Sequence, residues 1–151
     1  MKAVVQRVKC ASVKVDGALK GKIEAGLLVL LGVEKTDTDT DAEILAGKLS
    51  SLRIFSDQQG KRTLSVKDID GGMLVISNFT LCADTKKGNR PSFDPAMPPG
   101  EADRLYELVC SLLCKNGINR VEKGIFGADM QVDIVNDGPV TLVLDTAVWR
   151  K

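Results

Sequence analysis

The sequence predicts a mixed α/β (α+β) domain, rich in strands, in which two main helices pack on a sheet to give three layers. Short segments that are apolar or alternating and end at turn residues indicate strands, whereas two longer segments repeat apolar residues at helical spacing. The chain has 151 residues, 44% of them hydrophobic, which is enough for one compact core. We therefore expect a single domain over residues 1–151, with the order β-β-β-α-β-α-β-β.

The first three segments predict strands. Lys2 to Val15 alternates loosely, Asp16-Gly17 tolerates positive φ in a tight turn, and Leu19 to Ile23 returns as the second half of a hairpin. Leu27 to Val33 is short and continuously apolar, which is typical of a strand covered on both faces. Layers are therefore expected on both sides of the sheet.

Two segments predict helices. Thr40-Asp41-Ala42-Glu43 has the pattern of a capping box, so the first helix is expected over about Asp41 to Leu52. The second helix is expected after Pro98-Pro99, ends at Asn116-Gly117, and places Cys110 and Cys114 on or beside its buried face. Its apolar stripe comprises Ala102, Leu105, Tyr106, Val109, Leu112 and Leu113.

The remaining segments predict a buried strand, a long loop and two final strands. Met73 to Ile76 is apolar and ends at Ser77-Asn78-Phe79-Thr80, and Lys86 to Pro99 holds four of the five prolines. Gln131 to Val135 and Val140 to Leu144 are expected to be two strands around a turn at Asn136-Asp137-Gly138-Pro139.

Composition excludes several classes of site. Lys plus Arg (21) nearly equals Asp plus Glu (20), so a nucleic acid would have to be held by a local basic patch. The chain has no histidine, which excludes Ser-His-Asp and Cys-His catalysis and most catalytic zinc sites. The four cysteines lack CxxC spacing, and we expect no metal or cofactor. Without a signal-like or membrane-spanning run, the protein is expected in the cytoplasm.

Two polar clusters each end or interrupt an apolar strand, where a rigid scaffold can present groups to a ligand. In the first, Thr80 could act as a nucleophile, but the chain has no histidine to activate it, and a hydroxyl bonded to backbone at a strand end is favoured. For the second, Asn136 to Thr141, a plain turn is the favoured interpretation on spacing alone. Gly138 would admit close approach to the backbone, and Pro139 would leave carbonyl oxygens as bare acceptors.

Basic residues give two weaker signals. Lys86, Lys87 and Arg90 make a small basic loop that is either a phosphate-binding edge or simply solvated. Arg7 is informative only if its strand face is partly buried. The final residues, Ala147 to Lys151, predict no role.

Several ordered motifs resemble those of the D-aminoacyl-tRNA deacylases, formerly called D-Tyr-tRNA deacylases. Ser77-Asn78-Phe79-Thr80-Leu81 is similar to the family's SQFTL motif, with Asn78 where the family usually has Gln, and 136–141 matches its NDGPVT motif. The likeness extends almost end to end and includes Gln6-Arg7-Val8, Leu52-Arg53-Ile54-Phe55, Gly88-Asn89-Arg90-Pro91-Ser92-Phe93 and Phe126-Gly127-Ala128-Asp129-Met130.

The resemblance implies a hydrolase that cleaves D-amino acids from the 3′ end of tRNA, acting as a homodimer with its sites at the interface. It implies that Gly138 and Pro139, joined by a cis bond, enter the partner's pocket, where their carbonyl oxygens exclude an L side chain. Glycine has no side chain to exclude, so glycyl-tRNA mischarged on tRNA(Ala) is an expected second substrate.

The resemblance also implies roles for the individual residues. Ser77, Phe79 and Thr80, with their backbone NH groups, would hold the ester and the terminal adenosine, with the 2′-hydroxyl helping to activate water. Met130 would form an apolar wall, Arg7 would orient the Gly-Pro loop, and Asn78 would reach one methylene less far than Gln.

Two other functions remain open from the sequence. One is the related deacylase that edits L-alanine from mischarged tRNA(Thr), for which a trans Gly138-Pro139 bond is expected. The other is a non-catalytic dimer that only binds tRNA ends, for which the Ser77 to Thr80 strand end would be packed shut.

Overall fold

The computed structural model describes residues 1–151 as one six-stranded mixed sheet with two helices and a small two-stranded hairpin. The sheet has the order β2-β1-β3-β6-β7, and β8 pairs with the other edge of β1. In chain order, the elements are β1 (Lys2–Val15), β2 (Ala18–Ile23), β3 (Gly26–Gly32), α1 (Asp39–Ser51), β4 (Phe55–Ser56), β5 (Arg62–Leu64), β6 (Gly72–Ser77), the 3-10 helix η1 (Phe79–Cys82), α2 (Pro99–Lys115), β7 (Arg120–Lys123), β8 (Gln131–Asp145) and the 3-10 helix η2 (Thr146–Trp149).

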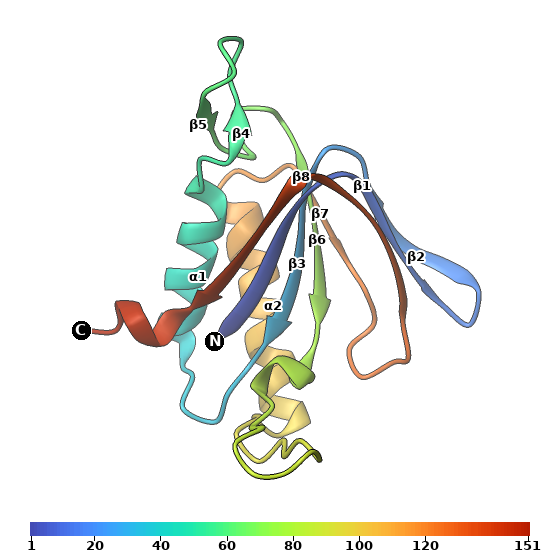
Figure 1. The fold of residues 1–151 in the computed structure, drawn as a ribbon, viewed down its shortest axis with the longest axis vertical. Helices are drawn as coiled ribbons and strands as arrows, with labels where there is room; N and C mark the ends of the chain where they lie inside the picture. The colour runs from blue at the N-terminus through green and yellow to red at the C-terminus, as the bar shows by residue number, and fades with distance from the viewer.

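Both helices cover one face of the sheet, and the long strands β1 and β8 bend across toward the other (Figure 1). Side chains therefore enter two cores. Along β3, Leu27, Val29 and Leu31 enter a cluster of 23 buried residues shared with the helices, whereas Leu28 enters a cluster of seven on the opposite face. This alternation explains the unbroken apolar run of β3, because each face of the strand meets a core.

The sheet curls because β1 changes partners along its length. Lys2 to Val8 pairs with β3, and Ala11 to Val15 pairs with β2. The curl brings β2 close to β7, where the carbonyl oxygen of Lys123 lies 2.9 Å from the position that a Cβ on Gly21 would occupy. The predicted mixed α/β class is thus confirmed, and the third layer is the curled part of the same sheet.

The hairpin, the buried strands and the second helix are confirmed. Asp16 and Gly17 have φ of 50° and 76°, and α2 has Pro99 at its start and Asn116 as its C-cap. The predicted first capping box is wrong by two residues. Asp41 accepts a hydrogen bond from the NH of Thr38 at 2.9 Å, which makes Thr38 the N-cap in place of Thr40.

The prediction of two final strands around a turn is also wrong. Residues 131–145 form the single strand β8, and both of its halves pair with β1. Gln6 pairs with Thr141 and Val8 pairs with Asn136, so residues 137–140 bulge from the strand opposite the single residue Arg7. Because β1 pairs with both halves, they stay aligned as one strand, and the Asn-Asp-Gly-Pro residues form a bulge in place of a turn.

Five elements were not predicted: β4, β5, η1, β7 and η2. Of the two cysteines expected on the buried face of α2, Cys110 is buried and Cys114 is exposed. Burial raises the pKa of the Cys110 thiol to about 12. Neither α1 nor α2 combines the length and the apolar character that a membrane-spanning helix requires.

The C-terminal segment is tied to the start of α1 through two buried carboxylates, those of Asp37 and Asp41. Arg150 donates to Asp41 at 2.8 Å and to Asp37 at 2.6 Å, and buried Thr146 donates to Asp41 at 2.6 Å. Burial acts to raise the pKa of Asp41, but the hydrogen bonds from Arg150, Thr146 and Thr38 together hold it far below its usual range. We call Asp37, Asp41, Thr146 and Arg150 the terminal clasp.

Candidate active site

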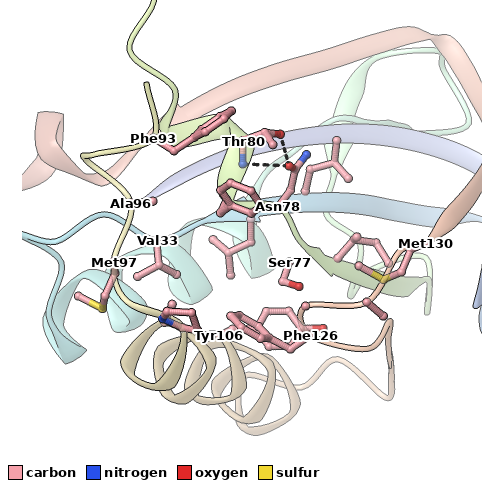
Figure 2. Close-up of a pocket in the computed structure, with 18 of the residues that line it drawn as sticks. Val33, Ser77, Asn78, Thr80, Phe93, Ala96, Met97, Tyr106, Phe126 and Met130 are labelled. Carbon is pink, nitrogen blue, oxygen red and sulfur yellow. Dashed lines mark hydrogen bonds between the residues drawn. The ribbon is translucent and has the colours of Figure 1, made fainter. Parts of the chain in front are cut away.

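A cavity of about 750 Å³ opens where β6 ends, between η1, the first turns of α2 and the segment before β8 (Figure 2). Fourteen of its 21 lining residues are hydrophobic, which is the usual character of a pocket for a small organic group. Three of its polar side chains, those of Ser77, Asn78 and Thr80, gather at the end of β6.

Parallel pairing places this cluster. Strands β3 and β6 run in the same direction, with Leu31 opposite Ser77, so their carboxyl ends meet at one edge of the sheet. The NH of Asn78 donates to the carbonyl of Leu31 at 2.8 Å, after which the chain turns into η1. The sequence prediction of a site at this strand end is consistent with an open cavity there.

Asn78 makes its contacts within η1. Its side-chain oxygen accepts from the NH of Thr80 at 3.3 Å and from the Thr80 hydroxyl, as the dashed lines in Figure 2 show. The expectation that backbone satisfies this hydroxyl is therefore wrong, because the partner is a side chain two residues away. The first NH of a helical turn has no acceptor within the turn, so that of Phe79 is left for another group.

No base is positioned to activate Thr80. The lining has two titratable residues, Tyr106 and Asp129. Burial raises the pKa of the Tyr106 hydroxyl well above its usual value, and this hydroxyl donates to the carbonyl of Val75 at 2.8 Å. Asp129 is exposed. The pocket therefore offers positioning and hydrogen bonds rather than an activated nucleophile.

The apolar walls come from segments far apart in the sequence. Met130 lines the cavity, as predicted, and so does Phe126. Phe79 is 59% exposed and packs edge to face against Phe93, with ring centroids 5.1 Å apart. The sequence prediction did not assign four of the lining residues to the site: Phe93, Met97, Tyr106 and Phe126. Phe93 and Phe126 lie in motifs that resemble the family's, whereas Met97 lies in the long loop and Tyr106 on the apolar stripe of the second helix.

The second cluster is not part of this cavity. Arg7 is opposite Leu27, at the amino end of β3, whereas Leu31 and Ser77 line the pocket at the carboxyl ends of their strands. Arg7, Gly138 and Pro139 therefore lie at the other end of the sheet.

A hydrogen-bond network holds the bulge at 137–140. The Arg7 side chain, only 11% exposed, donates from Nε to the carbonyl of Asp137 at 3.0 Å and from Nη1 to the carbonyl of Ile54 at 2.7 Å. Asn136 spans the bulge, since its amide oxygen accepts from the NH of Val140 at 3.0 Å and its amide nitrogen donates to the Val140 carbonyl at 3.2 Å. The Gly138-Pro139 bond is cis, the isomer that the family resemblance implies.

A model of the D-Tyr-tRNA(Tyr) deacylase family matches residues 4–145. The chain belongs to this family. It is 56% identical over 146 residues to a D-aminoacyl-tRNA deacylase of Anaeromyxobacter dehalogenans, with 97% of both chains covered. It is 55% identical over 146 residues to that of Geobacter sulfurreducens, with 97% of this chain and 95% of the relative covered.

Solved structures share the fold. One described as c-Myc DNA Unwinding Element Binding Protein superposes with a TM-score of 0.91 at 44% identity, covering 96% of this chain and 98% of the other. A probable eukaryotic D-amino acid tRNA deacylase gives a TM-score of 0.81 at 15% identity, covering 95% and 97%. This second likeness concerns the fold alone.

Proposed function

We propose that this member of the deacylase family hydrolyses D-aminoacyl-tRNA in the cavity at the end of β6, completed by the Gly138-Pro139 bulge of a second copy. Family membership supports the reaction and the substrate. The observation that carries the assignment of the site is that the polar cluster Ser77 to Thr80 opens into a largely apolar cavity of about 750 Å³. An aminoacyl ester on adenosine needs these two surfaces, one apolar and one hydrogen-bonding.

The chemistry follows from what the pocket contains. The backbone NH of Phe79, at the start of η1, would bind the ester carbonyl oxygen and stabilise negative charge as water attacks. Since no base activates Thr80, the 2′-hydroxyl of the terminal adenosine would assist the water. Phe79 and Met130 would provide apolar surface around the bound ester.

The chiral filter would come from the partner. Carbonyl oxygens beside Gly138 and Pro139, placed next to the substrate Cα, would leave room for hydrogen but clash with or repel an L side chain. The buried Arg7 would fix the direction of these carbonyls through its bond to Asp137. Such a filter cannot reject glycine, so glycyl-tRNA mischarged on tRNA(Ala) is a second proposed substrate.

Two alternatives have less support. The relatives that match over 97% of the chain are named as D-aminoacyl-tRNA deacylases, which favours D esters over the L-alanine editing reaction. A binding module without activity was expected to have the Ser77 to Thr80 strand end packed shut, whereas this end lines an open cavity.

The decisive test is single-turnover deacylation of D-Tyr-tRNA, L-Tyr-tRNA and Gly-tRNA, with EDTA present throughout. The proposal expects rapid loss of the D and glycyl esters and survival of the L ester. Binding of tRNA without cleavage of any ester would support the binding module. Rapid loss of the L ester would remove the chiral filter.

A subunit-mixing experiment tests whether the site is shared. Gly138→Ala damages the bulge, and Ala96→Trp fills the cavity. Each homodimer should be inactive, whereas a random mixture should recover about a quarter of the wild-type sites, because half of the dimers are mixed and each has one intact site. Absence of recovery would locate the whole site within one copy.

A further inference from the structure

The segment between η1 and α2 contains a surface loop that the proposed chemistry does not use. Residues 85–93 include three cations and no carboxylate, although the chain as a whole is almost neutral. Lys86, Lys87 and Arg90 are all exposed. None of them takes part in an ion pair within the chain. Their charge is therefore available to another molecule.

The base of this loop is held in place. Asp84 and Ser92 exchange two backbone hydrogen bonds, of 2.7 and 2.9 Å, and the carboxylate of Asp84 accepts from the NH of Lys86 at 2.9 Å. Beyond the base, the NH of Met97 donates to the carbonyl of Val33 at 3.0 Å, which ties the returning chain to the end of β3. The loop therefore projects from the surface with its two ends held together by backbone hydrogen bonds.

The base of the loop is also part of the cavity rim. Phe93, just after the loop, lines the cavity and packs on Phe79, and Figure 2 shows it beside Thr80 at the rim. Arg90 is three residues from Phe93, so the two Cα atoms are at most about 11 Å apart. A nucleic acid strand whose last nucleotide enters the cavity would leave past this rim.

We propose that Lys86, Lys87 and Arg90 form a phosphate-binding loop for the single-stranded 3′ end of tRNA, holding the nucleotides that precede the terminal adenosine. The inference rests on the proposed function, since it takes the terminal adenosine to be in the cavity. Charge complementarity identifies the ligand. Unpaired cations attract the phosphate groups of a nucleic acid, whatever its base sequence. The exposed ring of Phe79 adds a surface on which a base can stack.

The test compares two substrates that share the ester but differ in phosphates: D-Tyr-tRNA and D-tyrosyl-adenosine, which has none. The variant Lys86→Ala/Lys87→Ala/Arg90→Ala should raise KM for D-Tyr-tRNA about tenfold or more at physiological salt. It should cleave D-tyrosyl-adenosine at the wild-type rate. Its log(kcat/KM) for tRNA should depend less steeply on log salt, by about 2, since each single-strand phosphate contact contributes about 0.7.

A matched control removes the same charge at the opposite end of the molecule. Lys61, Arg62 and Lys67 are exposed, lack ion pairs and lie in or near the β4–β5 hairpin (Figure 1). The triple alanine variant there should keep the wild-type KM and salt dependence. An equal loss in both variants would mean that general charge attracts tRNA, and the proposal would fall.

The outcomes separate this inference from the proposed function. If wild-type protein cleaves neither substrate, the proposed function fails. If it cleaves both and the loop variant matches it on tRNA, only the phosphate-binding loop fails. If the loop variant loses D-tyrosyl-adenosine cleavage as well, with its melting temperature unchanged, the loop shapes the cavity and does not bind phosphate.

Discussion

The two halves of the proposed site lie at opposite ends of β3, and they are held in different ways. At the carboxyl end, Asn78 and Thr80 bond to each other across two residues beside an open cavity. At the amino end, the bulge is fixed by a buried cation from another strand and by both polar atoms of Asn136. In the proposed function, the end that would bind the ester needs only local order, whereas the end that would reject one mirror image has to be rigid.

Among the substitutions, Gly138→Ala should cause the largest loss of deacylation rate, because it disturbs the rigid half of the proposed site. The glycine has φ of 141°, and an added Cβ would stand 2.8 Å from the Val140 side chain and 2.9 Å from its NH. The bulge must shift, and a displacement of this kind costs about 100-fold in rate. Single-turnover rates on D-Tyr-tRNA measure it, with Gly100→Ala as control, since nothing lies within 4 Å of a Cβ there. Normal turnover would refute this account of the bulge.

Arg7→Lys should have the next largest effect. One ammonium cannot reproduce the planar fork that reaches the carbonyls of Asp137 and Ile54. The loss of one charge-assisted hydrogen bond predicts about a tenfold or greater fall in kcat/KM for the D ester. Arg104→Lys is a matched control, because Arg104 pairs only with exposed Asp39 and Glu101. Equal losses in the two variants would show that Arg7 is not special.

Thr80→Ala should have a small effect. The hydroxyl is bonded to Asn78 and has no base beside it, so activity on the D ester should fall by less than about tenfold. Loss of a residue that moves the reactive proton costs about 100-fold or more. Such a loss, with an unchanged melting temperature, would revive the nucleophile model. A substrate ending in 2′-deoxyadenosine should react much more slowly with the wild type, as an independent check.

Asp41→Asn should leave the deacylation rate unchanged, because the terminal clasp lies outside both halves of the proposed site. It should lower the free energy of unfolding by about 2–4 kcal/mol, through lost bonds to Arg150 and Thr146. The carboxylate contributes stability above its ordinary pKa of 3.8, and this is lost as acid protonates it. Denaturant unfolding at pH 7 and pH 3 should therefore show the difference shrinking in acid. Asp39→Asn, at an exposed position, is the control.

The sequence was sufficient for elements whose pattern is local. The apolar runs of β3 and β6 and the stripe of α2 specify their burial directly. It was insufficient where a partner decides the outcome: residues 136–139 read as a turn, yet β1 continues past them and keeps β8 as one strand. Strand β7 was missed because Arg120 to Lys123 is mostly charged and its pairing with β6 is long-range.

The residues of the proposed site likewise divide into those that a local sequence pattern indicates and those that only the fold brings together. Ser77 to Thr80 could be located because a polar cluster ended an apolar strand, and Met130 because a family motif contained it. Family motifs also contain Phe93 and Phe126, but nothing in the sequence assigned either residue to the site, because the cavity forms only when α2 and two loops meet at the end of β6. The contact between Arg7 and Asp137 joins residues 130 positions apart, and no periodicity in the sequence encodes such a distance.

The scarcity of ionisable groups in the cavity has a consequence for how hydrolysis responds to pH. A bell-shaped profile reports an essential acid and base of the enzyme. Here the buried Tyr106 hydroxyl donates its hydrogen bond to the carbonyl of Val75, and Asp129 is exposed. The variables that remain are the α-ammonium of the aminoacyl ester, which makes the carbonyl more electrophilic, and the supply of hydroxide. The pH dependence of the reaction then belongs to the substrate, and changing the amino acid would move it more than changing the protein.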